Sequence, residues 1–408
     1  MKNGKLPSGW KLMSVESLCA EGAPVRYGIL QPGPDVPEGV FYLRPTEIDN
    51  DQIHSGTLRR TTPAIANQYR RSSLLTNDII LSIVGTIGKV AVVPDWLEGG
   101  NITQSSARIR ADTSKILVDY LANCLRSPFL VDQFGAVKMG TAVTRLNIAH
   151  VRALQIPVPP LAEQQRIVGL LDEAFEGLAT AKANAEKNLQ NARALFESHL
   201  QSVFTQRGPG WVDTALGGVC GFVRGPFGGS LKKSIFVADG FAVYEQQHAI
   251  YDQFDDVRYF IDEAKFKEMK RFELLPDDLI MSCSGTMGRV AIVPKDIKRG
   301  IINQALLKLT PSSKILNTFL KSWMESEAFQ DALKEYSGGA AIQNVASVKN
   351  LKEIKVPLPS MSDQKRVVEE LDDLREETQR LARLYERKQA ALEALKKSLL
   401  HQAFTGEL

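Results

Sequence analysis

The stretch GTIGKVAVVP, Gly85 to Pro94, places a lysine in a glycine-bounded loop ahead of an apolar run. The same pattern returns 200 residues later as GTMGRVAIVP, Gly285 to Pro294, where arginine replaces the lysine and the cation is kept. A matching acidic and aliphatic run precedes each copy, DIILS in the first and DLIMS in the second. The chain therefore contains one unit twice.

Other segments repeat with the same offset. IPVP at 156–159 matches VPLP at 356–359, and QQRIV at 164–168 matches QKRVV at 364–368. Solenoid repeats have periods of roughly 20 to 50 residues, whereas this period has the length of a domain. We therefore infer a tandem duplication. The stretches 11–77 and 212–277 share little, which predicts one task performed on two different targets.

The lysine loop does not fit an ATP-binding site. A phosphate loop needs G-x-x-x-x-G-K-[ST], so that backbone N–H groups surround the phosphates and a hydroxyl binds magnesium. Here Gly85 and Gly88 are too close together, and Val90 replaces the hydroxyl residue. The chain also lacks an N/D-P-P-Y/F motif for amino methylation and a convincing acidic nuclease cluster. No catalytic residue is predicted.

Composition narrows the class of protein. The 408 residues are 44% hydrophobic and 24% charged, as in soluble globular chains of two to three domains. No apolar run is long enough for a transmembrane helix, and no signal core opens the chain, so a cytoplasmic location is expected. The net charge of +3 permits nucleic-acid binding without requiring it. Four scattered cysteines and five histidines lack metal-site spacing, so no metal is expected.

Two proline-free segments of about 45 residues predict long helices, from Leu161 to about Thr205 and again 200 residues later. Mostly apolar residues recur at alternating steps of four and three along each segment. This spacing predicts a stripe of contact residues, here called the seam, on one side of each helix. The expected seams run through Ile167, Leu171, Ala174, Leu178, Ala181, Ala185, Asn188, Ala192, Leu195 and His199, and through Val367, Leu371, Leu374, Thr378, Leu381, Tyr385, Lys388, Leu392, Leu395 and Leu399. Alanine dominates the first seam and leucine the second, so we expect the helices to pair antiparallel within the chain. The alternatives are packing on the separate domains or pairing between two chains.

The remaining segments indicate an α+β class. Residues 78–94 and 278–294 are typical of strand, glycine turn and strand, each ending at a proline. Further strands are expected near 41–43, 107–110 and 305–309, with amphipathic helices near 115–134 and 314–336.

Three loops recur in both halves and are candidates for contact with DNA, because amide, hydroxyl and guanidinium groups suit base edges and phosphates. The first contains Gly85, Thr86, Gly88 and Lys89, matched by Gly285, Thr286, Gly288 and Arg289. The second contains Gln68, Tyr69, Arg70 and Arg71, matched by Lys270 and Arg271. The third contains Lys138, Thr141, Thr144 and Arg145, answered by Gln343 and Asn344. The alternative for each is an ordinary turn, helix end or polar loop with solvated cations.

A fourth candidate occurs in the second half alone. The stretch RGPFGGSLKK contains Arg224, Lys232 and Lys233. Pro226 stands where a dinucleotide-binding motif would make its tight turn, so we interpret the loop as a phosphate-backbone contact.

These pieces, taken together and in order, resemble the DNA specificity subunit of type I restriction–modification enzymes over nearly the whole chain. The resemblance is carried by IPVPPLAEQQRI at 156–167, the paired Gly-Thr-x-Gly-[Lys/Arg]-Val-Ala segments, the Gly-Pro-Phe-Gly loop and the FTGEL terminus. One departure is MSDQ at 361–364, which replaces the family's usual Leu-x-Glu-Gln.

The resemblance implies two α/β target-recognition domains, at 1–157 and 208–357, each reading one half of a split DNA site. Helical regions at 158–207 and 358–408 would pair as an antiparallel coiled coil that sets the distance between the half-sites. It also implies a non-catalytic subunit without its own cofactor. Two modification subunits would methylate adenine with S-adenosylmethionine, and restriction subunits would cleave DNA with ATP and magnesium.

Three alternatives stay open. The chain could be a coiled-coil scaffold that binds protein and no DNA. It could be a nucleotide-dependent enzyme that uses the two glycine loops, although no acid–base constellation is repeated in both halves. It could also be the same subunit serving a system that only methylates.

Overall fold

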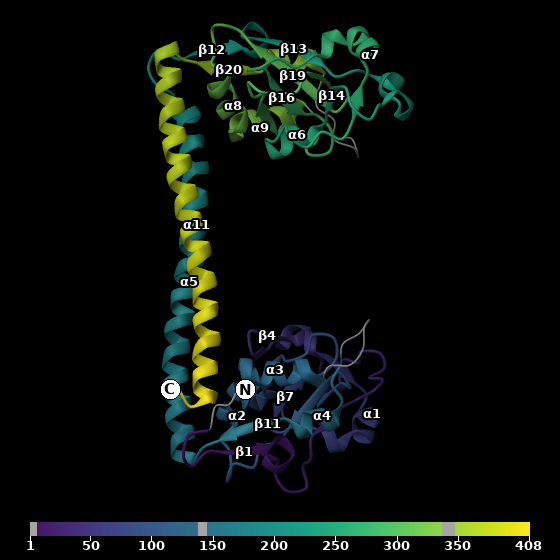
Figure 1. The fold of residues 1–408 in the computed structure, drawn as a ribbon, viewed down its shortest axis with the longest axis vertical. Coiled ribbons are helices and arrows are strands. Elements are labelled where there is room, and N and C mark those ends of the chain that lie inside the picture. The colour runs from purple at the N-terminus through teal and green to yellow at the C-terminus, as the bar shows by residue number, and fades with distance from the viewer. Residues whose placement is uncertain (1–5, 138–144, 337–346) are drawn as a thin grey trace. The chain divides into compact units, whose positions relative to one another are not determined.

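The structure is a computed structural model that describes residues 6–137, 145–336 and 347–408 (Figure 1). It divides into two compact units. Unit 1 comprises Met1–Glu186 together with Arg387–Leu408, and unit 2 comprises Lys187–Glu386. Each long helix therefore contributes one part to each unit, and the two units are described separately.

The main sheet of unit 1 has four strands. Its spatial order is β2 (Arg26–Tyr27), β10 (Ser106–Ile109), β7 (Ile79–Ser82) and β8 (Val90–Val92). All neighbours are antiparallel, and β7 and β8 form the hairpin that the sequence predicts around the Gly85 turn. A smaller sheet places β3 (Val40–Leu43) between β6 (Arg59–Thr61) and β9 (Asn101–Ile102), while β4 (Ile48–Asp49) and β5 (Gln52–Ile53) form a short hairpin. The strands expected near 41–43 and 107–110 are thus confirmed.

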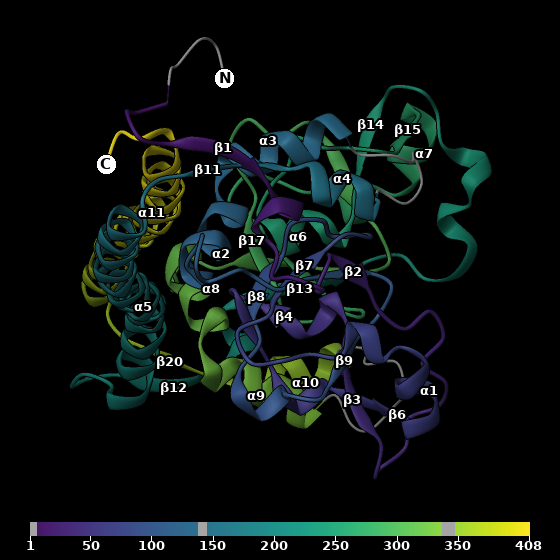
Figure 2. The same ribbon diagram turned by 90° about the horizontal axis from the view of Figure 1, so that it is seen from below.

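A further strand pair brings the two ends of the first domain together. Strand β1 (Lys11–Ser14) runs antiparallel to β11 (Gln155–Val158), and Figure 2 shows them side by side. The short helices α1 (Pro63–Gln68) and α4 (Ile148–Ala153) complete the domain. Because β11 leads directly into the long helix, this pair anchors the helix start to the domain.

The expected helix near 115–134 is two helices, α2 (Val118–Arg126) and α3 (Pro128–Val137). Ser127 between them is extended, and its buried hydroxyl donates to the Cys124 carbonyl at 2.6 Å. Unit 2 repeats the break at Ser326, between α8 (Asn317–Glu325) and α9 (Glu327–Tyr336), without any proline. Helices are thus present in both expected ranges, but each range is divided, since a buried serine that satisfies the preceding turn ends each first helix.

Unit 2 repeats the topology of unit 1. Its four-stranded sheet has the order β13 (Cys220–Arg224), β19 (Leu306–Pro311), β16 (Leu279–Ser282) and β17 (Val290–Ile292). A second sheet contains β15 (Phe260–Ile261), β14 (Phe241–Tyr244) and β18 (Gly300–Ile302), and β12 (Val212–Ala215) pairs with β20 (Lys355–Leu358). The remaining helices are α6 (Gln246–Tyr251), α7 (Glu263–Glu268) and α10 (Val348–Glu353).

The long helices are α5 (Leu161–Gln206) and α11 (Met361–Thr405), drawn in teal and yellow in Figure 1. Their lengths of 46 and 45 residues confirm the prediction from the sequence. Ser360 caps the start of α11, since its hydroxyl accepts from the Asp363 N–H at 3.2 Å.

The two long helices run in opposite directions within each unit. In unit 1, Lys182 pairs with Glu393 at 2.5 Å, and Lys396 lies over the Phe175 ring. In unit 2, the pairs are Arg193 with Glu386 at 2.9 Å and His199 with Glu370 at 3.0 Å. Antiparallel pairing is thus present in both units, while a single continuous coiled coil stays a prediction.

One part of the predicted seam is wrong. Leu195 and Leu395 are 51% and 47% exposed, whereas the next residues, Phe196 and Lys396, are half-buried. Lys388, which the prediction also placed in the seam, is exposed. A step of four follows Ala192 where the prediction used a step of three. Such an irregularity shifts the buried stripe around the helix, because 3.6 residues per turn do not divide a heptad evenly.

Each domain core is completed by both long helices. In unit 1, the Tyr120 hydroxyl donates to the Pro157 carbonyl at 2.8 Å, and its ring meets the Phe404 ring edge-to-face with centroids 5.1 Å apart. In unit 2, Phe204 contacts Phe319 with ring centroids 5.5 Å apart. The end of α11 thus packs into the first domain, and the end of α5 into the second.

The repeated glutamine explains the strongest sequence signature. Gln164 is fully buried; its side-chain carbonyl accepts from the Leu117 N–H at 2.8 Å, and its amide donates to the carbonyls of Lys115 and Pro159. Gln364 makes the same three bonds in unit 2, with Leu316 as the donor. This glutamine fastens each long helix to its own domain.

Within the described part of the chain, no helix is long and apolar enough to cross a membrane.

Candidate nucleic-acid interface

The duplicated Gly-Thr-x-Gly segment is a hairpin turn closed by a serine. The Ser82 hydroxyl accepts from the Lys89 N–H at 2.8 Å and donates to the Thr86 carbonyl at 2.6 Å. Ser282 does the same with Arg289 and Thr286, at 3.0 and 2.6 Å. The first glycine of each turn has a positive φ, which favours glycine. The repeat therefore preserves a backbone shape that leaves each threonine exposed.

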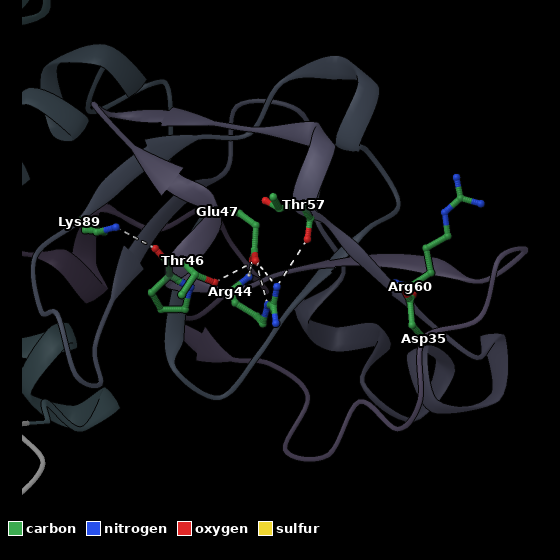
Figure 3. Close-up of polar contacts among 8 residues, drawn as sticks. Asp35, Arg44, Thr46, Glu47, Thr57, Arg60 and Lys89 are labelled. Atoms are coloured by element: carbon green, nitrogen blue, oxygen red, sulfur yellow. Dashed lines mark hydrogen bonds and ion pairs between the residues drawn. The ribbon is translucent and has the colours of Figure 1, made fainter. Parts of the chain in front are cut away.

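The two cations of this turn have different surroundings. The Lys89 ammonium donates to the Ile48 carbonyl at 2.6 Å and to the Pro45 carbonyl at 3.2 Å. Figure 3 shows one of these bonds as the dashed line that leaves Lys89. Arg289 is exposed, and its guanidinium has no partner among the described residues. Lys89 fastens the turn to the neighbouring segment, whereas Arg289 is available to a ligand.

A hollow of about 500 Å³ lies beside the Gly85 turn. Most of its lining is polar and includes Thr46, Thr86, Thr103, Gln104 and Ser105. The threonine and glutamine side chains offer both hydrogen-bond donors and acceptors, which is what the edges of bases require.

Arg44 also lines this hollow, but its positive charge is paired with the carboxylate of Glu47. Its Nε donates to the buried carboxylate of Glu47 at 2.9 Å, and the Thr46 hydroxyl donates to the same oxygen at 2.9 Å (Figure 3). Hydrogen bonding to Glu47 raises the pKa of the Arg44 guanidinium. Arg44 is thus held in place as part of the wall.

The described end of the third loop lies against the first. Arg145 forms an antiparallel bridge with Val84, and the Leu146 N–H donates to the Ile83 carbonyl at 2.8 Å. The exposed Arg145 is therefore next to the Gly85 turn. The other predicted residues of this loop lie outside the described residues, namely Lys138, Thr141, Thr144, Gln343 and Asn344.

The second loop lies at a different hollow. Gln68 ends α1, and the buried Ser72 fixes the following turn by donating to the Tyr69 carbonyl at 2.8 Å. Arg70 and Arg71 are exposed on this turn and line a second hollow of about 510 Å³. The structure thus joins the first and third loops and gives the second loop a site of its own.

The counterparts in unit 2 are less uniformly cationic. Lys270 and Arg271 are exposed, but Lys270 lies 3.4 Å from the Glu273 carboxylate, which also pairs with Arg299.

Arg224 lies beside the buried Cys283 thiol, whose pKa is raised to about 12 by burial, and Arg224 opposes that rise.

The Gly-Pro-Phe-Gly loop has a packing role at its first glycine. A Cβ on Gly225 would lie 1.8 Å from the Asn303 carbonyl oxygen, so only glycine fits there. Beyond it, Phe227 is 77% exposed, and Lys232 and Lys233 are exposed as well. The cations of the loop are therefore accessible, while its leading glycine serves the fold.

One pair of candidate residues escaped the sequence interpretation. Gln104 lines the hollow beside the Gly85 turn, and Gln304 stands 200 residues later. Both are exposed in the segment that leads into a central strand, β10 or β19. The constant offset was the signal that could have found them.

No metal-binding cluster of histidine, cysteine, aspartate or glutamate occurs among the residues that the structure describes. The four cysteines are buried and free.

Two similar α+β domains, each followed by a long helix, define a duplicated architecture. Both copies match one family model, the type I restriction modification DNA specificity domain, at residues 36–189 and 210–389. Because these matches cover most of the chain, it belongs to this family. It is a specificity subunit of type I restriction–modification, and DNA recognition is the function of that family.

Individual relatives agree with this assignment. The chain is 29% identical over 204 residues to the EcoBI specificity subunit of Escherichia coli, a match that spans 49% of this chain and 41% of that relative. It is 23% identical to the putative MjaX specificity subunit of Methanocaldococcus jannaschii, over 99% of this chain and 95% of the relative.

Solved structures share the fold. The HsdS subunit of Thermoanaerobacter tengcongensis has a TM-score of 0.67 at 22% identity, covering 100% of this chain and 99% of that one. A chain from a study of complex assembly and conformational transition in a type I R-M system has a TM-score of 0.78 at 22% identity, with 100% of both chains covered.

Proposed function

We propose that this subunit recognises a bipartite, asymmetric DNA site, with one half read by each domain and a spacer set by the long helices. Members of the family are the non-catalytic specificity component of their systems. The observation that carries the proposal is that the two domains share the same structural elements but have different surface residues. The serine-closed hairpin occurs twice, and so does the glutamine latch, which is the buried glutamine (Gln164 and Gln364) that fastens each long helix to its domain. The residues around the two hairpins differ.

The first half-site would be read at the hollow beside the Gly85 turn, by Thr86, Gln104 and Arg145. The second would be read around the Gly285 turn, by Thr286, Gln304 and Arg289. Threonine and glutamine occur at equivalent positions in both sets. The half-sites would therefore differ through the placement of the arginine, Arg145 in the first domain and Arg289 in the second, because base edges are distinguished by their donor and acceptor patterns.

We propose the partners and cofactors on the basis of the family resemblance. Two modification subunits would bind this chain and methylate adenine with S-adenosylmethionine. Restriction subunits would supply ATP- and magnesium-dependent cleavage. The chain itself would hold no cofactor and would act in the cytoplasm.

The test is methylation sequencing of host DNA in which the neighbouring methyltransferase subunit is expressed with and without this chain. The expected result is a chain-dependent adenine mark in a split, asymmetric motif with a fixed gap. A palindromic motif would contradict the asymmetry. Absence of any chain-dependent mark, with the partner shown to be folded and bound, would favour the scaffold alternative.

A further inference from the structure

The second hollow of unit 1, here termed the arginine hollow, is lined by five arginines that come from distant parts of the chain. They are Arg26, Arg70, Arg71, Arg108 and Arg110. Strand pairing places Arg26 of β2 opposite Arg108 of β10, and the turn after α1 adds the next two. A smaller hollow of about 270 Å³ shares Arg26 and Arg71 and adds Gln68 and Tyr69.

Arg108 is a buried cation at the wall of this hollow. Its side chain is 2% exposed; one terminal nitrogen donates to the Pro24 carbonyl at 3.1 Å, and its Nε has no partner among the described residues. Burial lowers the pKa of Arg108, and the neighbouring Arg110 and Arg26 act in the same direction, against Asp78. A buried guanidinium without its full set of acceptors is costly unless an anion is bound nearby.

The local carboxylate is already engaged. Asp78 accepts two bonds from Arg110, both at 2.7 Å, and a third from the Leu75 N–H at 2.8 Å. The side chains of Arg26, Arg70 and Arg71 have no hydrogen-bond or ion-pair partner within the described ranges. The arginine hollow therefore has a marked excess of positive charge.

The fold does not require this excess, because unit 2 lacks it. Lys308 occupies the place of Arg108, and its ammonium donates to the Glu273 carbonyl at 2.7 Å and lies 3.8 Å from the Asp278 carboxylate. Thr310 occupies the place of Arg110 and donates to Asp278 at 2.5 Å. The equivalent position in unit 2 is thus satisfied by the protein itself, whereas that in unit 1 is not.

We propose that the arginine hollow is a phosphate-binding site and that it holds a backbone phosphate of duplex DNA beside the first half-site. This inference rests on the proposed function. Guanidinium groups match phosphate oxygens with paired hydrogen bonds, and several convergent arginines suit one phosphate better than a neutral ligand. Phosphate contacts fix the register of a protein on DNA without reading its sequence. The site therefore contributes affinity and positioning to the first domain.

The experiment uses the full chain assembled with its modification subunits and a duplex that carries the mapped site. The variant is R70A/R71A, since both side chains are exposed and outside the core. Affinity is measured by fluorescence anisotropy at several salt concentrations. We expect weaker binding and a slope of log K against log salt that is smaller by about 0.9 per lost phosphate contact, with an unchanged methylated motif. The matched control is Arg59→Ala, an exposed arginine of β6 in the same unit, which should leave the slope unchanged.

A second measurement separates DNA phosphate from free phosphate. Inorganic phosphate, compared with chloride at equal ionic strength, should raise the thermal unfolding temperature of the wild-type complex and not that of the double variant. A phosphate effect combined with an unchanged DNA slope would overturn the DNA role. An unchanged slope without a phosphate effect would overturn the site altogether. A wild-type complex that marks no split motif would instead contradict the proposed function, and the phosphate measurement would still report on the hollow.

Discussion

The Lys89 ammonium lies 2.6 Å from the Ile48 carbonyl oxygen. Arg289, at the equivalent position of the second repeat, is exposed. The repeat conserves a cation, but the first one is bonded to the domain and the second is exposed to solvent. Equivalence in sequence therefore does not imply equivalence in function at this turn.

Lys89→Ala should destabilise the first domain by about 1–2 kcal/mol, because hydrogen bonds from a charged donor to two carbonyls are lost. Arg289→Ala should change stability by less than about 0.5 kcal/mol and should instead weaken DNA binding by the assembled complex. Hydrogen exchange at residues 45–48 and 85–90 measures the first effect, and anisotropy measures the second. Equal losses of DNA affinity with unchanged exchange in both variants would contradict this division.

Gln164→Ala should loosen the attachment of α5 to the first domain, at a cost of about 2–4 kcal/mol, since three backbone groups, one buried and two partly buried, lose their partner. Gln364→Ala should do the same to the second domain. Faster hydrogen exchange is expected at 115–117 in the first variant and at 314–316 in the second. The control is Gln165→Ala, the exposed neighbour, and a similar effect there would argue against the latch.

Phe404→Ala should destabilise the first domain, although this residue belongs to the last helix of the chain. Removing a fully buried phenylalanine typically costs about 3–5 kcal/mol. Hydrogen exchange should increase around Tyr120 and spare the second domain, and Phe204→Ala should give the opposite pattern. Leu395→Ala, at an exposed position of the same helix, serves as the control. Uniform exchange over both domains would contradict the contacts described above.

Insertion of one heptad after Glu186 and one after Glu386 should lengthen the spacer of the DNA motif. Both positions are unit boundaries, so the contacts within each unit are retained. Seven helical residues add roughly 10 Å, which corresponds to about three base pairs at 3.4 Å each. Methylation sequencing should show a longer gap between unchanged half-sites. A single insertion, in one helix only, should abolish the mark, and an unchanged gap in the double insertion would refute the helix-length explanation.

T86A/Q104A should alter the first half-site alone, and T286A/Q304A the second alone. Loss of a side chain that bonds a base edge relaxes the preference at that position by about 1–3 kcal/mol. Methylation sequencing of each variant should therefore show one degenerate half and one intact half. Degeneracy in both halves from one double variant would show that these residues support the fold.

The features that could be predicted from the sequence are those that depend on short sequence patterns and on the internal repeat. The Gly85 and Gly285 hairpins follow from turn glycines between short apolar runs, and the long helices follow from an unbroken helical period. The domain duplication follows from a constant offset. Individual DNA contacts remain predictions at this point.

Tertiary contacts account for what the sequence did not reveal. The partners of Lys89 lie more than forty residues earlier, on a segment with no recognisable signal for binding a lysine. Arg108 meets Arg26 only through strand pairing, so the arginine hollow cannot be seen from spacing. Gln164 was visible as part of a signature, but two of its three bonds go to Leu117 and Lys115, which are distant in sequence.

The exchange of helix ends between the units has a consequence for how such a gene could arise. Phe204 and Phe404 are the same residue of the two repeats, and each completes the core of the domain in the other half. A polypeptide with a single repeat would therefore need a second copy of itself to supply this phenylalanine, as in a two-fold symmetric dimer. Fusion of two such genes would join both subunits in one reading frame. Each half could then diverge independently, so that a symmetric ancestor with one preference would become a protein with two.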